Sequence, residues 1–265
     1  MGRKRDFPLI EKVEILDAGS EGKAVARVDG RVVFVPFVVP GDVADIQVTK
    51  KKKNYYEGRA VRFHSHSGRR VEPACSHFGL CGGCRWQNMS YSDQLFYKQK
   101  QVVDNLQRIG KLELPEILPI IPSANTYYYR NKLEYTFSNR RWFTEKPGPG
   151  ETGGKDPNGL GFHLPGMFDR ILDIDRCYLQ QDPSNAIRLA TRDFALEHGY
   201  EFYDVKKWDG YLRNLIIRTS SSGEVMVIIV FRYVDHIKGP ALMDHLVEKF
   251  PEITSLMYVI NDKRN

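Results

Sequence analysis

The sequence predicts a small β-barrel followed by a larger α+β domain. The first 65 residues contain five short strand patterns separated by turn residues, which is typical of a closed barrel of the OB type. Beyond residue 69, helical patterns and strongly β-branched strands follow one another without a regular alternation. A length of 265 residues is that of about two domains. We therefore expect a barrel over residues 1–68 and a central α+β domain over residues 69–265.

Turn residues mark the ends of the strands expected in the barrel. Asp29-Gly30 is a strong hairpin signal, and Pro40-Gly41-Asp42 marks a second turn. Between turns, apolar and polar residues alternate with the period of a half-buried strand. The five expected strands are Val13–Leu16, Lys23–Val28, Arg31–Val35, Val43–Thr49 and Tyr55–Phe63.

Three helices are expected in the second domain. The first runs over residues 93–109, with Ser92 as its cap and Gly110 at its end. The second begins at Asp182-Pro183, with proline as the first helical residue, and the third spans Ala241–Phe250. The Gly- and Pro-rich segment 146–159 is expected to be a mobile loop. The expected strands are Arg130–Phe137, Gly159–His163, Leu215–Thr219, Glu224–Arg232 and Ser255–Ile260.

The basic charge of the chain is concentrated near its N-terminus. The net charge is +6, and the first 70 residues, with 15 Lys and Arg against 9 Asp and Glu, account for all of it. This asymmetry favours a polyanionic partner, RNA or DNA, over a solvated basic face without a partner. A membrane is disfavoured because no basic amphipathic helix accompanies the charge. No protein partner is required by the sequence.

The chain lacks the signals of a membrane or secreted protein. No stretch of 18 uncharged apolar residues is long enough to cross a bilayer, and the charged N-terminus leads into no apolar signal segment. We therefore expect a cytoplasmic protein, in which structural disulfides are rare.

The four cysteines form one pattern. Cys75, Cys81 and Cys84 lie within ten residues, and Cys177 follows after 92 more. Glycines 82 and 83 allow the backbone to turn sharply around a metal centre. Four thiolates suit an iron–sulfur cluster or tetrahedral zinc, and unrelated buried thiols are the remaining alternative. Three nearby histidines are rival ligands, although such residues beside a linker are more often at the surface: His64, His66 and His77.

Four motifs resemble one family of enzymes. They are Cys75-x5-Cys81-Gly-Gly-Cys84-Arg-Trp-Gln, Tyr129-Arg130-Asn131-Lys132, Gly161-Phe162-His163 and Asp173-Ile174-Asp175-x-Cys177-x-Leu-Gln. In this order they are similar to the iron–sulfur type of S-adenosylmethionine-dependent RNA 5-methyluridine methyltransferases, which include enzymes of 23S ribosomal RNA. The resemblance covers most of the chain. It implies an RNA-binding TRAM barrel and a central domain with a 4Fe-4S cluster on Cys75, Cys81, Cys84 and Cys177.

The sequence also departs from this family. Its members continue into a Rossmann-like methyltransferase domain that binds S-adenosylmethionine, and we find no acidic-x-Gly-x-Gly turn of that kind here. The reaction at uracil C5 also needs a free thiolate to add to C6, which would be a fifth cysteine. The sequence stops directly after an apolar strand. We therefore expect an inactive RNA-recognition portion of a 23S rRNA methyltransferase, which presents the uridine to a catalytic domain outside this chain.

Two alternatives belong to other classes of protein. One is a stand-alone zinc or iron–sulfur module that binds RNA without catalysis. The other is a radical methylthiotransferase, which also combines a TRAM barrel with a cluster. It is disfavoured because its Cys-x3-Cys-x2-Cys spacing leaves one iron open, whereas a fourth thiolate closes the site here.

Two groups of polar residues are candidate RNA contacts. Lys50, Lys51, Lys52 and Lys53 can bind phosphates, and the adjacent Tyr55 and Tyr56 can stack on bases; a solvated loop is the alternative. Arg130, Asn131 and Lys132 can read bases or phosphates, or form salt bridges on a strand surface. Around the cysteines, Phe78 and Trp86 are expected to shield the cluster rather than stack on a base. His163 and Asp173 are expected to pack and hydrogen-bond around Cys177.

Overall fold

A computed structural model describes residues 7–144 and 156–264 of the chain. The chain forms two compact units. The first contains Met1–Gly79 and Cys84–Ala124, and the second contains Leu80–Gly83 and Asn125–Asn265. Most of the loop expected over 146–159 lies outside the described residues. No helix among the described residues is long and apolar enough to cross a membrane.

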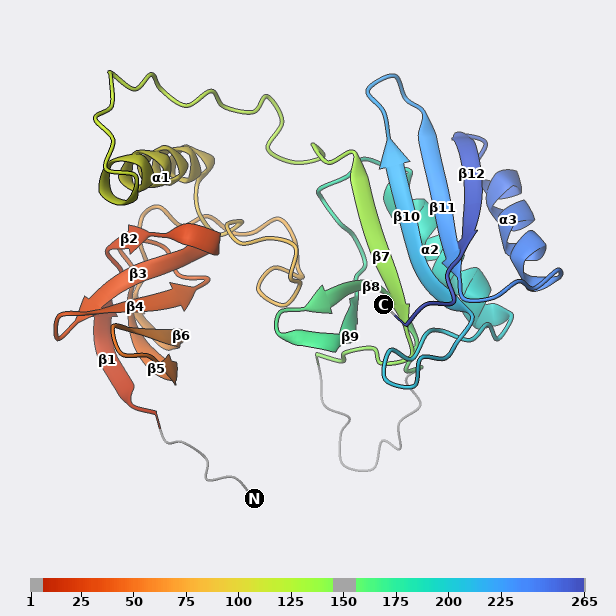
Figure 1. Ribbon diagram of the computed structural model, residues 1–265, viewed down its shortest axis with the longest axis horizontal. Coiled ribbons are helices and arrows are strands. Elements are labelled where there is room, and N and C mark those ends of the chain that lie inside the picture. Colours follow the sequence, from red (N-terminus) through yellow and green to blue (C-terminus); the bar gives the residue numbers. More distant parts are fainter. Residues whose placement is uncertain (1–6, 145–155, 265) are drawn as a thin grey trace. The chain divides into compact units, whose positions relative to one another are not determined.

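The first unit is built on a six-stranded sheet that curls round on itself (Figure 1). The order in the sheet is β1-β5-β6-β4-β3-β2, so β1 and β2 are its two edges. Only Ile15 and Leu16 separate these edges in the chain, and the Leu16 N–H donates to Val25 O at 2.8 Å. One continuous segment therefore joins both edges, which closes the barrel. The strands are β1 Leu9–Glu14, β2 Asp17–Ala18, β3 Lys23–Val28, β4 Arg31–Pro36, β5 Val43–Lys51 and β6 Tyr55–Ser65.

The hairpin predicted at Asp29-Gly30 is confirmed. Both residues have positive φ, 49° and 76°, and Val28 pairs with Arg31 across the turn, as a two-residue type I′ hairpin requires. Strand β1 starts at Leu9, four residues before the sequence predicts. An irregularity at Lys12, where φ is 51°, interrupts its alternating pattern. Small and β-branched side chains and one tyrosine form the interior: Val13, Ile15, Ala24, Ala26, Val33, Val35, Val38, Ala44, Ile46, Val48 and Tyr56.

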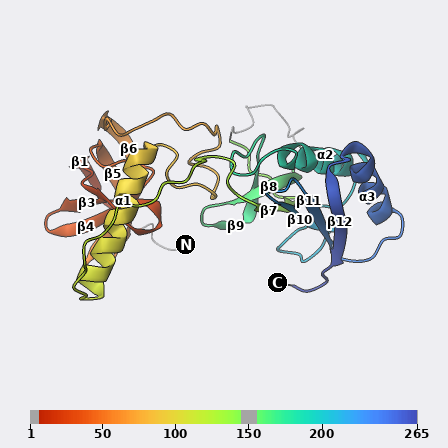
Figure 2. The ribbon, with the colours of Figure 1, turned by 90° about the horizontal axis from the view of Figure 1, so that it is seen from above.

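Helix α1, Tyr91–Asp104, packs against this barrel (Figure 2). Its cap is Ser90 rather than Ser92, because the Ser90 hydroxyl accepts the N–H of Asp93 at 3.2 Å. One π-helical turn, η2 Asn105–Ile109, follows. Tyr97 of α1 packs with Ala18 and Val39 of the barrel. The helix therefore belongs to the first unit, whereas the sequence placed it with the central domain; the predicted boundary after residue 68 stays a prediction.

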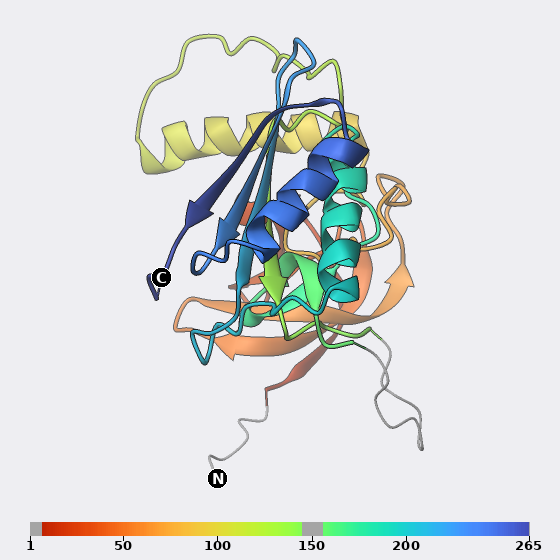
Figure 3. The same ribbon diagram turned by 90° about the vertical axis from the view of Figure 1, so that its right-hand side faces the viewer.

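The second unit contains a mixed sheet covered by two helices on one face. The sheet order is β12-β11-β10-β7-β8-β9, antiparallel except for the parallel pair of β11 and β12. Figure 3 shows helices α2 and α3 side by side on this face. The strands are β7 Lys132–Ser138, β8 Gly159–Leu164, β9 Met167–Asp173, β10 Leu212–Thr219, β11 Val225–Phe231 and β12 Ile253–Ile260, and the helices are α2 Ser184–Glu197 and α3 Lys238–Lys249.

Three of the differences from the sequence prediction in the second unit concern β9, α2 and α3. Strand β9 was not predicted, because its burial changes gradually from exposed to buried along the strand instead of alternating. Helix α2 begins after Pro183, which follows a cis peptide bond and is not the first helical residue. Helix α3 begins three residues early, since the Asp235 carboxylate accepts the N–H groups of Ile237 and Lys238 at 2.9 and 2.8 Å.

Candidate functional site

Two of the four cysteines lie in the first unit and share one partner. The side chain of Gln87 accepts the N–H of Cys75 at 3.2 Å and donates to the Cys84 sulfur, also at 3.2 Å. Burial raises the pKa of the Cys75 thiol, while the N–H groups of His77 and Phe78 oppose this shift by donating to its sulfur. Gln87 therefore connects the two cysteines, and the net effect of the surroundings is to make the Cys75 thiol harder to ionise.

The other two cysteines lie in the second unit. The Gly83 N–H points at the Cys81 sulfur at 3.4 Å. Cys177 is buried, and the side chain of Asn185, in the first turn of α2, holds its backbone at both ends. The Cys177 N–H donates to Asn185 Oδ1 at 2.7 Å, and Asn185 Nδ2 donates to the Cys177 carbonyl at 3.1 Å. The loop that carries Cys177 is thus fixed to a helix.

The N–H groups directed at the cysteine sulfurs are compatible with thiolate ligands. Within residues 7–144 and 156–264 there is no group of three or more His, Cys, Asp or Glu side chains placed to hold a metal ion. Backbone and side-chain N–H groups directed at sulfur are the usual surroundings of cluster ligands. The cysteines individually fit the predicted cluster, and the cluster itself stays a prediction.

Two of the rival histidines have other partners. His64 Nε2 lies 2.6 Å from Asp45 Oδ1, in a half-buried pair on the barrel. The ring of His66 lies against Phe63, with 4.8 Å between the ring centroids. Both contacts are local to the first unit and explain these residues without a metal.

The four predicted lysines lie at the end of β5 and in the turn that follows it. Lys50 Nζ pairs with Glu57 Oε1 at 2.9 Å, and this hydrogen bond raises the pKa of Lys50. Lys51 Nζ lies 5.6 Å from the centre of the Tyr56 ring. Lys52 and Lys53 are exposed at the turn. The turn thus presents cations at the surface, two of which already contact barrel side chains.

Of the two adjacent tyrosines, only one can present its ring to a base. Tyr56 faces the barrel interior and is 7% exposed, because the register of β6 places it opposite Val33 of β4. Its hydroxyl accepts a hydrogen bond from Arg31. Tyr55 points the other way, is half-buried and packs edge-on against Phe34. The expectation that Tyr56 stacks on a base is therefore wrong.

Arg130, Asn131 and Lys132 are all exposed, just before and at the start of β7. Their backbone is held on two sides. The Arg130 N–H donates to Leu179 O at 2.8 Å, and the Asn131 carbonyl accepts the N–H of Thr219 at 3.0 Å. Lys132 forms an exposed ion pair with Glu134 at 3.2 Å. The three side chains therefore reach solvent from an ordered backbone, as residues that contact a ligand do.

The aromatic residues near the cysteines have packing roles within the first unit. Trp86 packs against the Ala18 and Val39 cluster, and its indole N–H donates to Gly22 O at 3.2 Å. Phe78 packs edge-on against Phe37, with 5.5 Å between ring centroids. The contacts of both rings are thus with the barrel, and shielding of a cluster by them stays a prediction.

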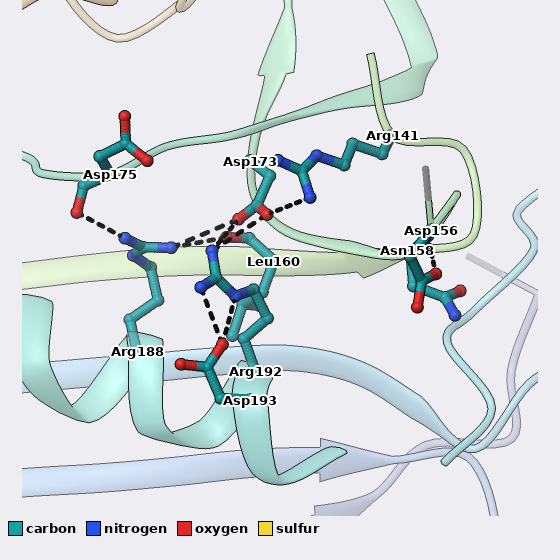
Figure 4. A network of polar contacts seen from close by, with 9 residues as sticks. All are labelled: Arg141, Asp156, Asn158, Leu160, Asp173, Asp175, Arg188, Arg192 and Asp193. Atoms are coloured by element: carbon teal, nitrogen blue, oxygen red, sulfur yellow. Dashed lines mark hydrogen bonds and ion pairs between the residues drawn. The ribbon is translucent and has the colours of Figure 1, made fainter. Parts of the chain in front are cut away.

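Asp173 is the centre of a buried ionic network in the second unit (Figure 4). Its carboxylate pairs with Arg141 and Arg192 at 3.1 Å and with Arg188 at 3.5 Å. Arg188 is itself completely buried and donates to the carbonyl groups of Leu160 and Asp175 at 3.1 and 3.0 Å. Asp173 therefore supports the loop before Cys177 through Arg188. His163 lies exposed on β8. The expectation that it packs and hydrogen-bonds around Cys177 stays a prediction.

Sequence reasoning missed the residues that hold the cysteines. Gln87 lies in the quoted Cys84-Arg-Trp-Gln motif, and its amide could have been read as a partner for the thiols. Asn185 and Arg188 gave no such signal, because their partners lie 8 and 28 residues away in the chain. Only the fold brings helix α2 to the Cys177 loop.

Comparisons with known proteins show what the chain is similar to. A profile of the TRAM domain matches residues 10–61, so the first unit contains a TRAM domain. The chain is 54% identical over 249 residues to an uncharacterized RNA methyltransferase of Bacteroides thetaiotaomicron, covering 93% of this chain and 55% of that protein. It is 47% identical over 258 residues to one of Porphyromonas gingivalis, covering 96% and 56%. The chain spans about half the length of these relatives.

One solved structure has a similar fold. The crystal structure of the Pyrococcus abyssi tRNA (uracil-54, C5)-methyltransferase in complex with S-adenosyl-L-homocysteine superposes with a TM-score of 0.64 and 22% identity. The match covers 96% of this chain and 52% of that one. At this identity the likeness concerns the fold alone.

These matches correct four expectations. The expected fold class was a barrel and a central domain without the methyltransferase domain. It is contradicted, because 96% of this chain aligns with a methyltransferase structure. The expectations of a separate RNA-recognition portion and of a chain that is inactive by itself are contradicted by the alignment of 93–96% of this chain with RNA methyltransferases. The expectation that S-adenosylmethionine is bound by a domain missing from this chain is contradicted by the same alignments. These expectations depended on an unmatched glycine motif and on where the sequence stops, and neither observation establishes what a protein lacks.

Proposed function

We propose that the protein is an S-adenosylmethionine-dependent RNA methyltransferase. The observation that carries this proposal is the alignment of 93–96% of the chain with RNA methyltransferases at 54% and 47% identity. The TRAM domain at residues 10–61 and the excess of basic residues in the first 70 support an RNA substrate. The solved relative was determined with S-adenosyl-L-homocysteine, the demethylated donor.

The methylated atom in this proposal is C5 of a uridine. The support is the motif resemblance given above, together with a solved relative that is named for uracil C5 of tRNA. S-adenosylmethionine supplies the electrophilic methyl group, and we assign none of the described residues to donor binding. Arg130, Asn131, Lys132 and Lys50–Lys53 are proposed to bind the RNA, because all are exposed on ordered backbone.

A cluster on the four cysteines is a separate part of the proposal. We infer that Cys75, Cys81, Cys84 and Cys177 ligate a 4Fe-4S cluster, which would link the two segments of chain. Its support is the cysteine spacing and the N–H donors at Cys75, Cys81 and Cys84. Iron, sulfide and zinc are measured after anaerobic purification, for the protein and for Cys177→Ser. Stoichiometric zinc without sulfide would exclude the cluster.

The activity is tested in the organism that carries the gene. Deletion of the gene should remove one 5-methyluridine from ribosomal or transfer RNA, detected by mass spectrometry of RNA fragments, and complementation should restore it. Comparing 23S rRNA with tRNA in the same samples identifies the substrate. Loss of a different modification, or an unchanged RNA, would refute the uridine assignment.

A further inference from the structure

A group of tyrosines lies on the surface of the second unit beside the Arg130 segment. The ring of Tyr178 lies 6.2 Å from that of Tyr127 and 6.1 Å from that of Tyr128. All three rings are half-buried, and Tyr129 between this group and Arg130 is 57% exposed. We call these four residues, Tyr127, Tyr128, Tyr129 and Tyr178, the tyrosine cluster. Aromatic rings that are half-buried or exposed in one place are typical of a binding surface rather than a core.

The backbone that carries the tyrosine cluster is fixed. The Tyr128 N–H donates to Tyr178 O and the Arg130 N–H donates to Leu179 O, both at 2.8 Å, so the two segments run side by side. Tyr178 follows Cys177, whose backbone Asn185 holds at both ends. Tyr128 has a φ of 56°, a conformation that an aromatic residue rarely adopts. Strained backbone of this kind tends to cluster at binding and catalytic sites, where the surrounding structure holds it in place.

One positive charge lies next to a ring of the tyrosine cluster, and another directly follows Tyr129 in the chain. The guanidinium of Arg176 lies 5.5 Å from the centre of the Tyr178 ring, and its ion pair with Asp182 is exposed, at 3.2 Å. The guanidinium of Arg130 forms no hydrogen bond or ion pair with any residue in 7–144 or 156–264. Exposed ion pairs contribute little, so Arg176 can exchange its partner for a phosphate group. Rings beside exposed guanidinium groups match a nucleic-acid strand, with its bases and phosphates.

We propose that the tyrosine cluster binds an unpaired base of single-stranded RNA, with Arg130 and Arg176 on the flanking phosphates. Single-stranded RNA is chosen because the faces of bases in a duplex are already stacked and cannot accept a ring. This inference rests on the proposed function, for which RNA is the substrate, and adds that the substrate segment is unpaired at this point. The ring of Tyr129 is assigned the principal stacking contact, because it is the most exposed of the cluster.

The test compares two RNAs and three variants. Fluorescence anisotropy measures the affinity of the purified protein for a single-stranded oligonucleotide and for a duplex of the same sequence. Tyr129→Ala should weaken binding of the single strand about tenfold or more and leave duplex binding unchanged. Tyr129→Phe, which retains the ring, should bind like the wild type. Tyr258→Ala is the matched control, since Tyr258 on β12 is 58% exposed in the same unit, and it should change neither affinity.

The outcomes separate this inference from the proposed function. If Tyr129→Ala retains single-strand affinity, or loses affinity equally for both RNAs, the tyrosine cluster does not stack on an unpaired base. In that case the protein can still methylate RNA, which the gene deletion measures independently. If Tyr129→Phe fails as Tyr129→Ala does, the hydroxyl rather than the ring makes the contact, and stacking is again refuted. Far-ultraviolet circular dichroism of each variant establishes that it is folded.

Discussion

Arg70 donates two hydrogen bonds, each 2.8 Å long, to the two carboxylate oxygens of Asp42. The Asp42 side chain is completely buried. Its oxygens also accept the N–H groups of Val39 at 2.6 Å and Ser67 at 2.9 Å. The pair thereby fixes the turn before β5 to the segment after β6, which leaves the barrel at this point.

Asp42→Ala should therefore be strongly destabilising. The substitution leaves the Arg70 guanidinium and two backbone N–H groups without their partner, and breaking a buried pair in this way costs about 3 kcal/mol. The measurement is the free energy of unfolding from urea titration. Lys23→Ala breaks the exposed pair of Lys23 and Glu21 and should cost less than about 0.5 kcal/mol. Equal costs for the two variants would show that burial does not control the strength of the Asp42 pair.

Asp45 should make the barrel sensitive to acid. The N–H of Lys12 and the ring of His64 lower the pKa of the Asp45 carboxyl below its usual 3.8. The unfolded chain therefore binds this proton at a higher pH than the folded protein does. The stabilisation is present above about pH 4 and is lost as the pH falls through the lower folded pKa. Asp45→Asn should thus be less stable than wild type at pH 6, and the difference should shrink below pH 4.

Glu11→Gln is the matched control for this pH dependence. Glu11 is exposed on β1, next to Lys12. The stability of the Glu11→Gln variant relative to the wild type should change little between pH 6 and pH 3 in the same urea titrations. A difference for Asp45→Asn that stays constant over this range would refute the role of the Asp45 carboxylate.

The lysines at the end of β5 should contribute sequence-independent affinity for RNA. Each lysine that contacts a phosphate changes the slope of log K against log salt by about 0.7–0.9. Lys52→Ala and Lys53→Ala should flatten this slope by that amount. Lys50→Ala should change it less, since Lys50 is paired with Glu57. An unchanged slope in the Lys52 and Lys53 variants would remove the turn from the RNA interface.

Local patterns in the sequence were sufficient for much of the fold. Strand β3 has the predicted bounds, Lys23–Val28, because its alternation and both flanking turns lie within a few residues. The orientation of Tyr56 was not predictable, since a shift of one residue in the register of β6 reverses which face each ring occupies. Strand β9 lacks alternation altogether. Predictions failed where a strand lacks alternation or where the register between strands decides which face a side chain occupies.

The candidate site likewise contains residues that local patterns predicted and residues that they did not. The cysteines were found from their spacing, which is a local property for Cys75, Cys81 and Cys84. Their supports were not found, since Asn185 and Arg188 reach the Cys177 loop only after α2 has packed on the sheet. The position of Tyr178 beside Tyr127 and Tyr128 likewise depends on two backbone hydrogen bonds between segments about fifty residues apart.

The Asp173 network should be more sensitive to loss of its carboxylate than to loss of its buried arginine. Burial lowers the pKa of Arg188, and the carboxylate of Asp173 compensates the charge of this arginine. Asp173→Asn leaves Arg188 charged, buried and next to Arg141 and Arg192, and should cost about 3–5 kcal/mol.

Arg188→Met removes that charge together with its need for a counterion. It retains an apolar side chain of similar length, and Asp173 still pairs with Arg141 and Arg192. Its cost should therefore be smaller, about 1–3 kcal/mol, mainly from the lost hydrogen bonds to Leu160 and Asp175. Urea titration of both variants and of the double variant measures the coupling between the two residues. Arg188→Met could instead lower the free energy of unfolding more than Asp173→Asn does. In that case the backbone contacts of Arg188, rather than charge compensation, hold the loop before Cys177 in place.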